Sequence, residues 1–359
     1  MASAKYLFIG WELVSAAVNC KSQWDQFPKI ILYDYDSYEP VQALLTSSDI
    51  THVKHCNLEP AVDRGRKWTP PRISSDQTVS LLYTSGTTGK PKAVMMPAVW
   101  VFLRLLFPAV PVIGPSTPVY CCLPLFHGVG MYGGTLVTLG ASAPLILARK
   151  FSISKFWFDI ERTRATGFMY VGELCRYIVQ APKSAEETLV LERGHLKFAK
   201  GLGMNARIWE QLVERLNISV CEYYSASEAT ITLSNYSSSP FTVGAVAKIG
   251  LLGRLFNNSW VLVRHDVDTG EVIRDPKTGL CIPCKLGEPG EIVETYNDDQ
   301  EPFHGYFGNE KATTEKKLRD VLKKGDSWLR LGDLLVLDKD GLLRFQDRLG
   351  DTYRSKGIT

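Results

Sequence analysis

The chain has 359 residues, of which 45% are hydrophobic and 22% are charged, and its formal net charge is +3. This composition is typical of a soluble globular protein with a large core, and the length predicts one large domain or two to three subdomains. The small net charge argues against a nucleic-acid-binding protein. The first residues show no signal-peptide pattern and the eight cysteines are scattered, so we expect an intracellular protein in a reducing compartment.

The first 75 residues alternate apolar runs with a helical pattern. The runs KYLFIG (5–10) and KIILYDYD (29–36) are predicted strands on either side of a helix in LVSAAVNC (13–20). The alternation continues to about residue 235. In ARIWEQLVERL (206–216), for example, Ile208, Leu212 and Leu216 recur every four residues and give a helix one apolar face. Alternating strands and helices predict layered α/β structure.

A glycine- and hydroxyl-rich loop lies in LLYTSGTTGKPKAVMM (81–96). It is not a Walker A loop, because Gly86 and Gly89 are three positions apart instead of five and Pro91 follows Gly89-Lys90 where Ser or Thr is required. The residues TVSLLY (78–83) are predicted to form a buried strand before it. Glycines allow close backbone approach, successive N–H groups can form an anion nest, and Lys92 adds a positive charge. We therefore interpret this segment as a phosphate cradle; a solvated hairpin turn is the alternative.

An apolar run from Val94 to Ile113 is about 20 residues long, which is enough to span a bilayer. Arg104 lies in its middle, and it contains three prolines. We interpret the run as a buried helix followed by an apolar connection. A peripheral membrane contact and a spanning helix remain as alternatives.

Four further segments carry or flank candidate site residues. In CCLPLFHGVGM (121–131), His127 taken alone favours a strand end with a hydrogen-bonded core histidine. The segments YVGELCRYI (170–178) and GLGMNARIW (201–209) contain glycines, including Gly203, that fit turns before helices. The segment CEYYSASEATI (221–231), taken alone, is a strand end that runs into a polar turn. The ring of Tyr224 offers a stacking face, and the carboxylate of Glu228 is a ligand type that Mg²⁺ prefers.

From about residue 240 to 346, short β-branched runs stand between Gly, Pro and Asp turns and predict a β-rich subdomain. Within it, Cys281 and Cys284 form a lone C-x-x-C pair with no second Cys or His pair nearby, which does not match a structural zinc site. The last segment, LRLGDLLVLDKDGLLRFQDRLGDTYRSKG (329–357), contains Asp333 and Arg348. An isolated Gly-Asp-Leu of this kind is usually a turn.

In this order and spacing, the segments resemble motifs of the adenylate-forming (AMP-binding) superfamily. Residues 83–92 match its phosphate loop without a gap, residues 221–231 are similar to its E-F-Y-G-A-T-E-G-N motif, and residues 329–357 to its R-T-G-D-L and D-R-x-G-D-T-F-R-W-K-G motifs. Residues 121–131 and 170–178 resemble the branch of fatty-acid transport proteins and very-long-chain acyl-CoA synthetases. The resemblance extends from about residue 78 to 357 and is weak before residue 75.

The resemblance implies an α/β fold with layered α/β/α sheets and a small distorted β-barrel subdomain. It divides the chain into a partial first α/β subdomain (1–75), a nucleotide-binding α/β subdomain (76–235), a β-rich subdomain (236–346) and a hinge stub (347–359). In this superfamily a small C-terminal domain, which supplies a lysine and completes the thiol site, follows the hinge. We therefore expect this chain to be a truncated core without that domain.

The resemblance also implies roles for individual residues. The loop residues would close over the β- and γ-phosphates of ATP: Thr84, Ser85, Gly86, Thr87, Thr88, Gly89 and Lys92. Tyr224 would stack on adenine, Ser227 would contact the α-phosphate, and Glu228 would help hold Mg²⁺. Asp333 would accept both ribose hydroxyls, which one carboxylate can do. Arg348 would contact the ribose or a phosphate.

The acyl site is implied near His127 and Gly203. Lys92, Ser227, Glu228 and His127 are thus the expected catalytic residues. Three positions depart from the superfamily pattern: Ser225 replaces Gly, Ser227 replaces Thr but keeps the hydroxyl, and Leu331 replaces Thr with loss of a polar contact.

The reaction implied is adenylation of a long- or very-long-chain fatty acid by Mg-ATP, followed by transfer to coenzyme A. Catalysis of this kind relies on positioning and on charge stabilisation at phosphate oxygens. The expected partners are fatty acid and ATP, with coenzyme A if a lid domain is supplied. Peripheral association with the endoplasmic reticulum, a peroxisome or the plasma membrane is compatible. A nucleotide-binding remnant without turnover, or adenylation of a different carboxylic acid, are the alternatives.

Overall fold

The computed structural model describes residues 6–10, 16, 19, 29–33, 53–55, 71–84, 91–106, 113–266, 268–296 and 303–349. The chain divides into two compact units, residues 1–72 and 73–359. In the first unit, β1 (Tyr6–Gly10), β2 (Lys29–Tyr33) and β3 (Val53–His55) form a parallel sheet in that order. The two strands predicted here are confirmed. Of the helix predicted between them, residues 16 and 19 are described and are helical.

The second unit begins with a hairpin of β4 (Thr78–Thr84) and β5 (Lys92–Pro97), followed by α3 (Ala98–Leu106). The prediction of a buried strand over 78–83 is wrong in its burial, because within β4 only Leu82 is buried. A two-stranded ribbon has few neighbours to cover its faces. The prediction of one buried helix from residue 94 is also corrected, because residues 94–97 pair with β4 and the helix begins at Ala98. Among the described residues, no helix is long and apolar enough to cross a membrane.

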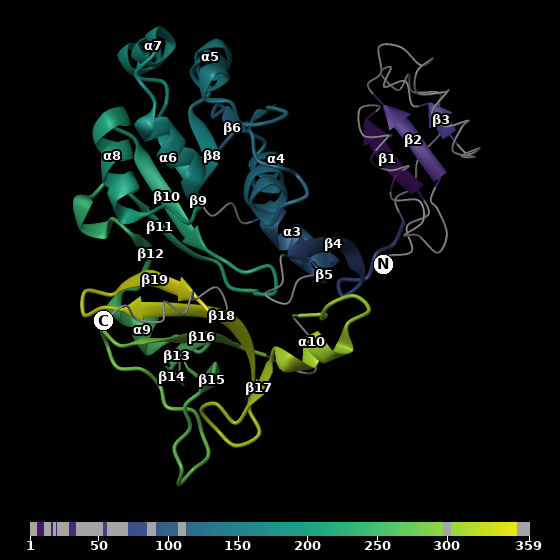
Figure 1. Cartoon of the computed structure of the whole chain (residues 1–359), viewed down its shortest axis with the longest axis vertical. Helices are drawn as coiled ribbons and strands as arrows, with labels where there is room; N and C mark the ends of the chain where they lie inside the picture. The colour runs from purple at the N-terminus through teal and green to yellow at the C-terminus, as the bar shows by residue number, and fades with distance from the viewer. Residues whose placement is uncertain are drawn as a thin grey trace. The chain divides into compact units, whose positions relative to one another are not determined.

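A six-stranded sheet with the order β11-β10-β9-β8-β6-β7 forms the centre of the α/β part (Figure 1). Its strands are parallel except for β11, which pairs antiparallel with β10. The strand bounds are β6 (Val119–Cys121), β7 (Leu145–Leu147), β8 (Gly167–Val171), β9 (Phe198–Leu202), β10 (Ser219–Tyr224) and β11 (Leu233–Ser237). β6, β8, β9 and β10 are almost entirely buried, as expected for strands covered on both faces.

Helices connect these strands and cover the sheet. The bounds are π-helical η3 (Val129–Leu136), α4 (Val137–Gly140), α5 (Ile153–Thr163), α6 (Gly172–Gln180), α7 (Ala185–Arg193) and α8 (Ala206–Leu216). The helix predicted over 206–216 is confirmed as α8, with Trp209, Leu212 and Leu216 buried and the side chain of Asn205 capping its first turn. Its apolar face belongs to the main core, together with Phe156 and Phe168.

The β-rich part follows as an antiparallel sheet with the order β12-β19-β18-β16-β13, to which β17 adds by pairing with β18. The bounds are η4 (Pro240–Thr242), β12 (Ala245–Lys248), α9 (Leu251–Leu255), β13 (Trp260–Val263), β14 (His265–Asp266), β15 (Glu271–Val272), β16 (Pro289–Thr295), α10 (Glu310–Glu315), β17 (Lys317–Arg319), β18 (Ser327–Leu337) and β19 (Leu342–Arg348). The predicted strands of this part are confirmed, but the prediction of a distorted barrel is wrong. In the described residues, the outer strands β12 and β13 do not pair, so the sheet stays open.

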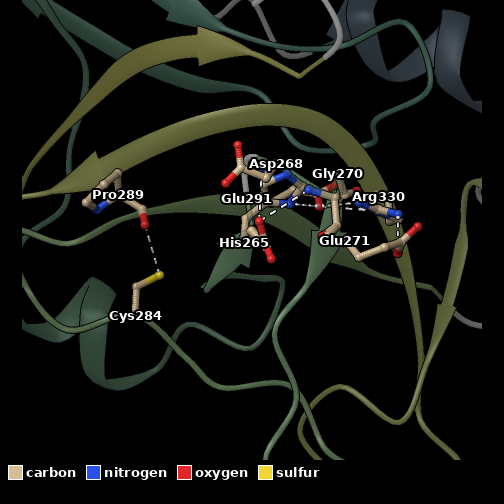
Figure 2. Close-up of polar contacts among 10 residues, drawn as sticks. His265, Asp268, Gly270, Glu271, Cys284, Pro289, Glu291 and Arg330 are labelled. Carbon is tan, nitrogen blue, oxygen red and sulfur yellow. Dashed lines mark hydrogen bonds and ion pairs between the residues drawn. The ribbon is translucent and has the colours of Figure 1, made fainter.

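A charged cluster around the buried Glu291 joins this sheet to the β14–β15 ribbon (Figure 2). Glu291 of β16 accepts hydrogen bonds from Nη2 of Arg330 at 2.8 Å and from its Nε at 3.0 Å. Nδ1 of His265 lies 3.3 Å from the same carboxylate, and Nη1 of Arg330 lies 3.4 Å from Glu271. Burial raises the pKa of Glu291, but the neighbouring His265 and Arg330 outweigh it and leave the pKa below its usual value.

Candidate functional site

Tyr224 and Asp333 join the α/β part to the β-rich part. Tyr224 ends β10, and its hydroxyl donates a 2.8 Å hydrogen bond to Oδ2 of Asp333 in β18. Arg348 pairs with Asp333 across β18 and β19, and its Nε lies 4.0 Å from Oδ1. Burial raises the pKa of Asp333, while Tyr224 and Arg348 act in the opposite direction. Burial and the Asp333 charge together raise the pKa of Tyr224 well above its usual value.

Tyr306 connects Lys92 to Glu228. The Tyr306 hydroxyl donates a hydrogen bond to Oε1 of the buried Glu228, and Nζ of Lys92 lies 5.3 Å from the centre of the Tyr306 ring. Residues 305–307 are held against β5, because the N–H of Met95 donates to the carbonyl of Gly305 at 3.0 Å. Burial, and then the Glu228 charge, raise the pKa of Tyr306. The structure thus brings a cation, a phenol and a carboxylate together from three distant segments.

The predicted phosphate loop lies partly outside the described residues. This applies to Ser85, Gly86, Thr87, Thr88 and Gly89. The two predicted residues that border them are described. Thr84 and Lys92 pair across the hairpin of β4 and β5, and the Thr84 hydroxyl donates to the Lys92 carbonyl at 3.5 Å.

The two sequence neighbours of Glu228 line a cavity of about 90 Å³, whose lining is mostly apolar. The predicted residues His127 and Ser227 both line it. The ring of His127 is fixed by the N–H of Val129, which donates to Nδ1 at 3.2 Å. The lining as a whole combines the hairpin, the π-helix and the segment after β10: Leu82, Met96, Trp100, His127, Gly128, Val129, Tyr132, Gly133, Leu202, Tyr223, Ser225, Ala226, Ser227 and Ala229.

The wall formed by η3 depends on close packing. Gly133 faces Tyr223, and a Cβ at Gly133 would meet the Tyr223 hydroxyl at 2.4 Å, so a larger residue requires a shift. The buried Lys200 donates from Nζ to the Gly133 carbonyl at 2.8 Å. π-Helical turns are frequent at functional sites. In η3 the Gly133 carbonyl accepts a hydrogen bond from a side chain of β9.

Gly203 follows β9 with φ +75°, a conformation that favours glycine. The next residue, Met204, donates its N–H to Oε1 of Glu222 at 3.0 Å, and the Tyr170 hydroxyl donates to Oε2. Burial raises the pKa of Glu222 to about 7, although these hydrogen bonds act against the rise. The buried Glu222 therefore fixes the turn at Gly203 next to the cavity-lining Leu202.

Sequence reasoning missed four residues that support the site. Tyr306 and Lys200 contact predicted segments, Glu222 anchors the Gly203 turn, and Glu294 holds the backbone after Glu228. Both Glu294 oxygens accept the Thr230 N–H, at 2.9 and 3.1 Å, and Oε1 accepts the Ile231 N–H at 2.9 Å. The signal for Lys200 and Glu222 is a charged residue within a mostly apolar strand, since such a residue is rarely buried without a partner.

The residues present fit a magnesium nucleotide. Glu228 offers a carboxylate whose Oε1 is bonded to Tyr306, and within the described residues no hydrogen bond reaches its Oε2. Mg²⁺ commonly binds one or two carboxylates together with substrate phosphates. Asp333 has acceptor capacity beyond its bond to Tyr224.

The chain aligns with part of the length of each of two known relatives. The long-chain fatty acid transport protein 3 of Homo sapiens is 38% identical over 294 residues, which cover 80% of this chain and 41% of that protein. The very long-chain fatty acid transport protein of Saccharomyces cerevisiae is 37% identical over 297 residues, which cover 80% of this chain and 43% of that protein. The chain therefore spans about two fifths of the length of these relatives.

Two solved structures show the same fold. The amide bond synthetase McbA from Marinactinospora thermotolerans superposes with a TM-score of 0.66 at 20% identity, covering 96% of this chain and 60% of that one. ATP-bound MatB from Rhodopseudomonas palustris gives a TM-score of 0.62 at 23% identity, covering 89% of this chain and 59% of that one. The family model described as AMP-binding enzyme matches residues 2–294, which is most of the sequence, and the chain belongs to this family.

Proposed function

We propose that this chain is the nucleotide-binding core of an adenylate-forming ligase that activates a long- or very-long-chain fatty acid. One observation supports the proposal: the six-residue segment from Tyr224 to Ala229 bonds Asp333 and Tyr306 and also lines the mostly apolar cavity. Tyr224 and Glu228 reach Asp333 and Tyr306 on the nucleotide side. Ser227 and its neighbours line the mostly apolar cavity on the other side.

The first half-reaction joins a carboxylate oxygen to the α-phosphorus of ATP and releases pyrophosphate. In the proposed arrangement, Asp333 and Arg348 hold the ribose, Tyr224 lies against the adenine, and Lys92 and the loop hold the phosphates. Ser227 donates to an α-phosphate oxygen. Glu228 would hold Mg²⁺, which supplies charge neutralisation at the phosphates when bound. Because Lys92 and Glu228 share Tyr306 as a neighbour, both act on the same end of the nucleotide.

The second half-reaction transfers the acyl group from AMP to the thiol of coenzyme A. The relatives named as fatty acid transport proteins support a fatty acid as the acyl donor, with His127 and Gly203 beside the acyl group. The apolar lining of the cavity between His127 and Ser227 is consistent with a methylene chain near the carboxylate. The proposed location is intracellular and peripheral to a membrane, where such acids are concentrated.

A second candidate is a protein that binds ATP or an acyl adenylate without turnover. Leu331 favours it, because a buried apolar side chain replaces the hydroxyl expected beside Asp333. Ser225 favours it as well, because it lines the cavity where glycine is expected and narrows the space for substrate.

ATP–pyrophosphate exchange tests the proposal. The purified chain would be assayed with Mg²⁺ and acids from medium to very long chain, together with an aromatic acid. We expect exchange with long or very long acids, and Lys92→Ala, Glu228→Ala and Asp333→Ala each to reduce both exchange and Mg-ATP binding. The Cys281→Ser variant is the matched control and should leave both unchanged. Mg-ATP binding without exchange for any acid would favour the second candidate. Exchange with the aromatic acid alone would contradict the proposal that the substrate is a fatty acid.

A further inference from the structure

Helix α9 and Phe256 expose large apolar side chains on the β-rich part. The side chains of Leu251, Leu252, Leu255 and Phe256 are 64, 69, 68 and 78% exposed, and no residue of α9 is buried. We call these four residues the apolar tip. Single exposed apolar side chains are ordinary, but four within six residues form a patch of the kind that contacts a partner or a membrane.

A groove of about 860 Å³ lies next to the tip, since Arg254 of α9 is part of its wall. Its lining combines aromatic rings with polar and basic groups: Arg254, Asn257, Asn258, Trp260, Val261, Thr295, Tyr296, Leu322, Lys323, Gly325, Asp326, Ser327 and Trp328. None of these residues is in the proposed nucleotide or acyl site. The groove is therefore a separate feature of the β-rich part.

Two polar groups in the groove wall are buried without a partner. Tyr296 is 5% exposed, and its hydroxyl has no hydrogen-bond partner among the residues that the structure describes. The same holds for Nε of Arg254. Leaving a buried donor unsatisfied destabilises the folded protein. A ligand with acceptor oxygens would satisfy both groups.

Among the described residues, the groove lining carries two cations, Arg254 and Lys323, and one carboxylate, Asp326. Lys317 lies beside it, with its Nζ 4.6 Å from the centre of the Tyr296 ring. Asp326 and the neighbouring Asp320 are both engaged within the protein. Asp320 pairs with Lys324 at 3.6 Å, and Asp326 accepts backbone N–H bonds of 2.6–2.9 Å from residues 321–323. Positive charge is thus left to face an anionic partner.

We propose that the apolar tip and the groove together dock the protein on an anionic membrane surface. The tip enters the boundary between headgroups and acyl chains, as exposed apolar residues of interfacial helices do. Arg254 and Lys323 bind lipid phosphate groups, and the Tyr296 hydroxyl donates to a phosphate oxygen. Basic residues near a membrane surface attract anionic lipids in this way. The inference deepens the membrane association within the proposed function but requires no adenylation activity.

Two other occupants fit the surface less well. A second copy of the chain placed by two-fold symmetry would bring the same cations against each other, which disfavours a dimer through this face. A soluble anion would use Arg254 and Tyr296 but would leave the apolar tip uncovered. An anionic membrane uses the apolar and the basic groups at the same time.

Vesicle flotation of the whole chain tests the proposal. Vesicles of phosphatidylcholine would be compared with vesicles that also contain about 30% phosphatidylserine, at low and high salt. We expect binding to the anionic vesicles that weakens with salt. The triple variant Leu252→Ser, Leu255→Ser, Phe256→Ser should lose most of the binding, and Arg254→Gln with Lys323→Gln should weaken it by about fivefold or more per cation.

Tyr296→Phe is the sharpest variant, because within the described part of the chain the hydroxyl that it removes makes no hydrogen bond. It should not lower the unfolding midpoint, because the hydroxyl that it removes is buried without a partner, and it should still weaken binding to the anionic vesicles. Leu286→Ser and Lys277→Gln change an exposed leucine and an exposed lysine elsewhere, and both should bind as the wild type does.

Three results would overturn the proposal. The first is equal binding of the triple variant and wild type. The second is binding of inorganic phosphate that needs Tyr296 while vesicles are not bound, which would indicate a soluble anion. The third is a concentration-dependent dimer in sedimentation velocity that the triple variant abolishes. Because ATP–pyrophosphate exchange is measured without vesicles, failure here leaves the adenylation proposal standing.

Discussion

The hydroxyl of Tyr224 donates a 2.8 Å hydrogen bond to Asp333, although the two residues are 109 positions apart and belong to different sheets. The bond fixes the carboxylate that is proposed to hold the ribose. It also ties the end of β10, where the cavity-lining segment begins, to the middle of β18. The orientation of the proposed nucleotide site therefore depends on a contact between the two parts.

The variant Tyr224→Phe tests the role of the Tyr224 hydroxyl apart from that of the ring. The ring remains for adenine, but the buried Asp333 loses a donor, so we expect Mg-ATP affinity to fall by up to about tenfold, the equivalent of a typical single hydrogen bond of about 1 kcal/mol or slightly more. Asp333→Ala should cost much more, because it removes the carboxylate itself. Calorimetric titration with Mg-ATP measures both. Equal losses for the two variants would contradict the assignment of separate roles.

Local patterns in the sequence predicted individual elements well. The four-residue recurrence of Ile208, Leu212 and Leu216 predicts α8, because a helix repeats its face over this spacing. The β-branched runs after residue 240 predict the strands of the β-rich part for the same kind of reason. Burial was harder to predict. The apolar run of β4 is compatible with a core strand, but a two-stranded ribbon leaves most of it accessible.

Contacts between distant segments could not be predicted from local pattern. The sequence motifs suggested Glu228 and Lys92 separately, but not that Tyr306 lies between them. Residue 306 is 78 positions beyond Glu228, and only the pairing of residues 305–307 with β5 brings it there. Glu222 was not predicted because its hydrogen-bond partners lie in other segments of the chain. The Tyr170 hydroxyl belongs to β8, and the Met204 N–H follows β9.

Tyr306→Phe tests the link between Lys92 and Glu228. The variant keeps the ring beneath Lys92 but removes the hydrogen bond to the buried Glu228 carboxylate. Loss of a hydrogen bond to a charged group costs about 1.5–3 kcal/mol, and we expect that loss in the free energy of unfolding measured with urea. With the phenol gone, Mg²⁺ should restore part of the stability in the presence of ATP. The control is Tyr236→Phe, an exposed tyrosine on β11, which should change neither quantity.

The raised pKa of Glu222 predicts that the stability of the protein depends on pH. Its pKa is raised to about 7 in the folded protein, above the usual value of 4.5, chiefly by burial. Between these values the folded state binds more protons than the unfolded state, so this group's contribution is fully present below about pH 4.5 and is lost as the pH rises through about 7. The loss amounts to roughly 3 kcal/mol for a shift of this size.

Glu222→Gln removes the titration and should flatten the difference in unfolding free energy between pH 5 and pH 8 relative to wild type. Urea unfolding at several pH values, with each variant compared with wild type, isolates this residue because the other groups are shared. A wild-type profile that runs parallel to that of Glu222→Gln over this range would show that Glu222 is already ionised at pH 5.

Substitution of Arg330 is expected to lower the stability strongly without a direct effect on nucleotide binding. Its guanidinium donates three hydrogen bonds to the buried Glu291, which also lies next to His265 (Figure 2). Arg330→Ala would leave this carboxylate buried and without its cation, a change that typically costs about 3–5 kcal/mol. We expect a correspondingly lower urea midpoint.

The double variant Arg330→Met, Glu291→Met distinguishes the loss of a partner from the loss of packing. Replacing both charges by apolar side chains of similar length removes the desolvation cost together with the attraction, so it should recover most of the stability lost in Arg330→Ala. Arg176→Ala, which breaks an exposed pair with Glu173, serves as the control and should leave the unfolding free energy almost unchanged. If the double variant were as unstable as Arg330→Ala, the cluster would stabilise the sheet through packing, and the proposed cost of an uncompensated Glu291 would be wrong.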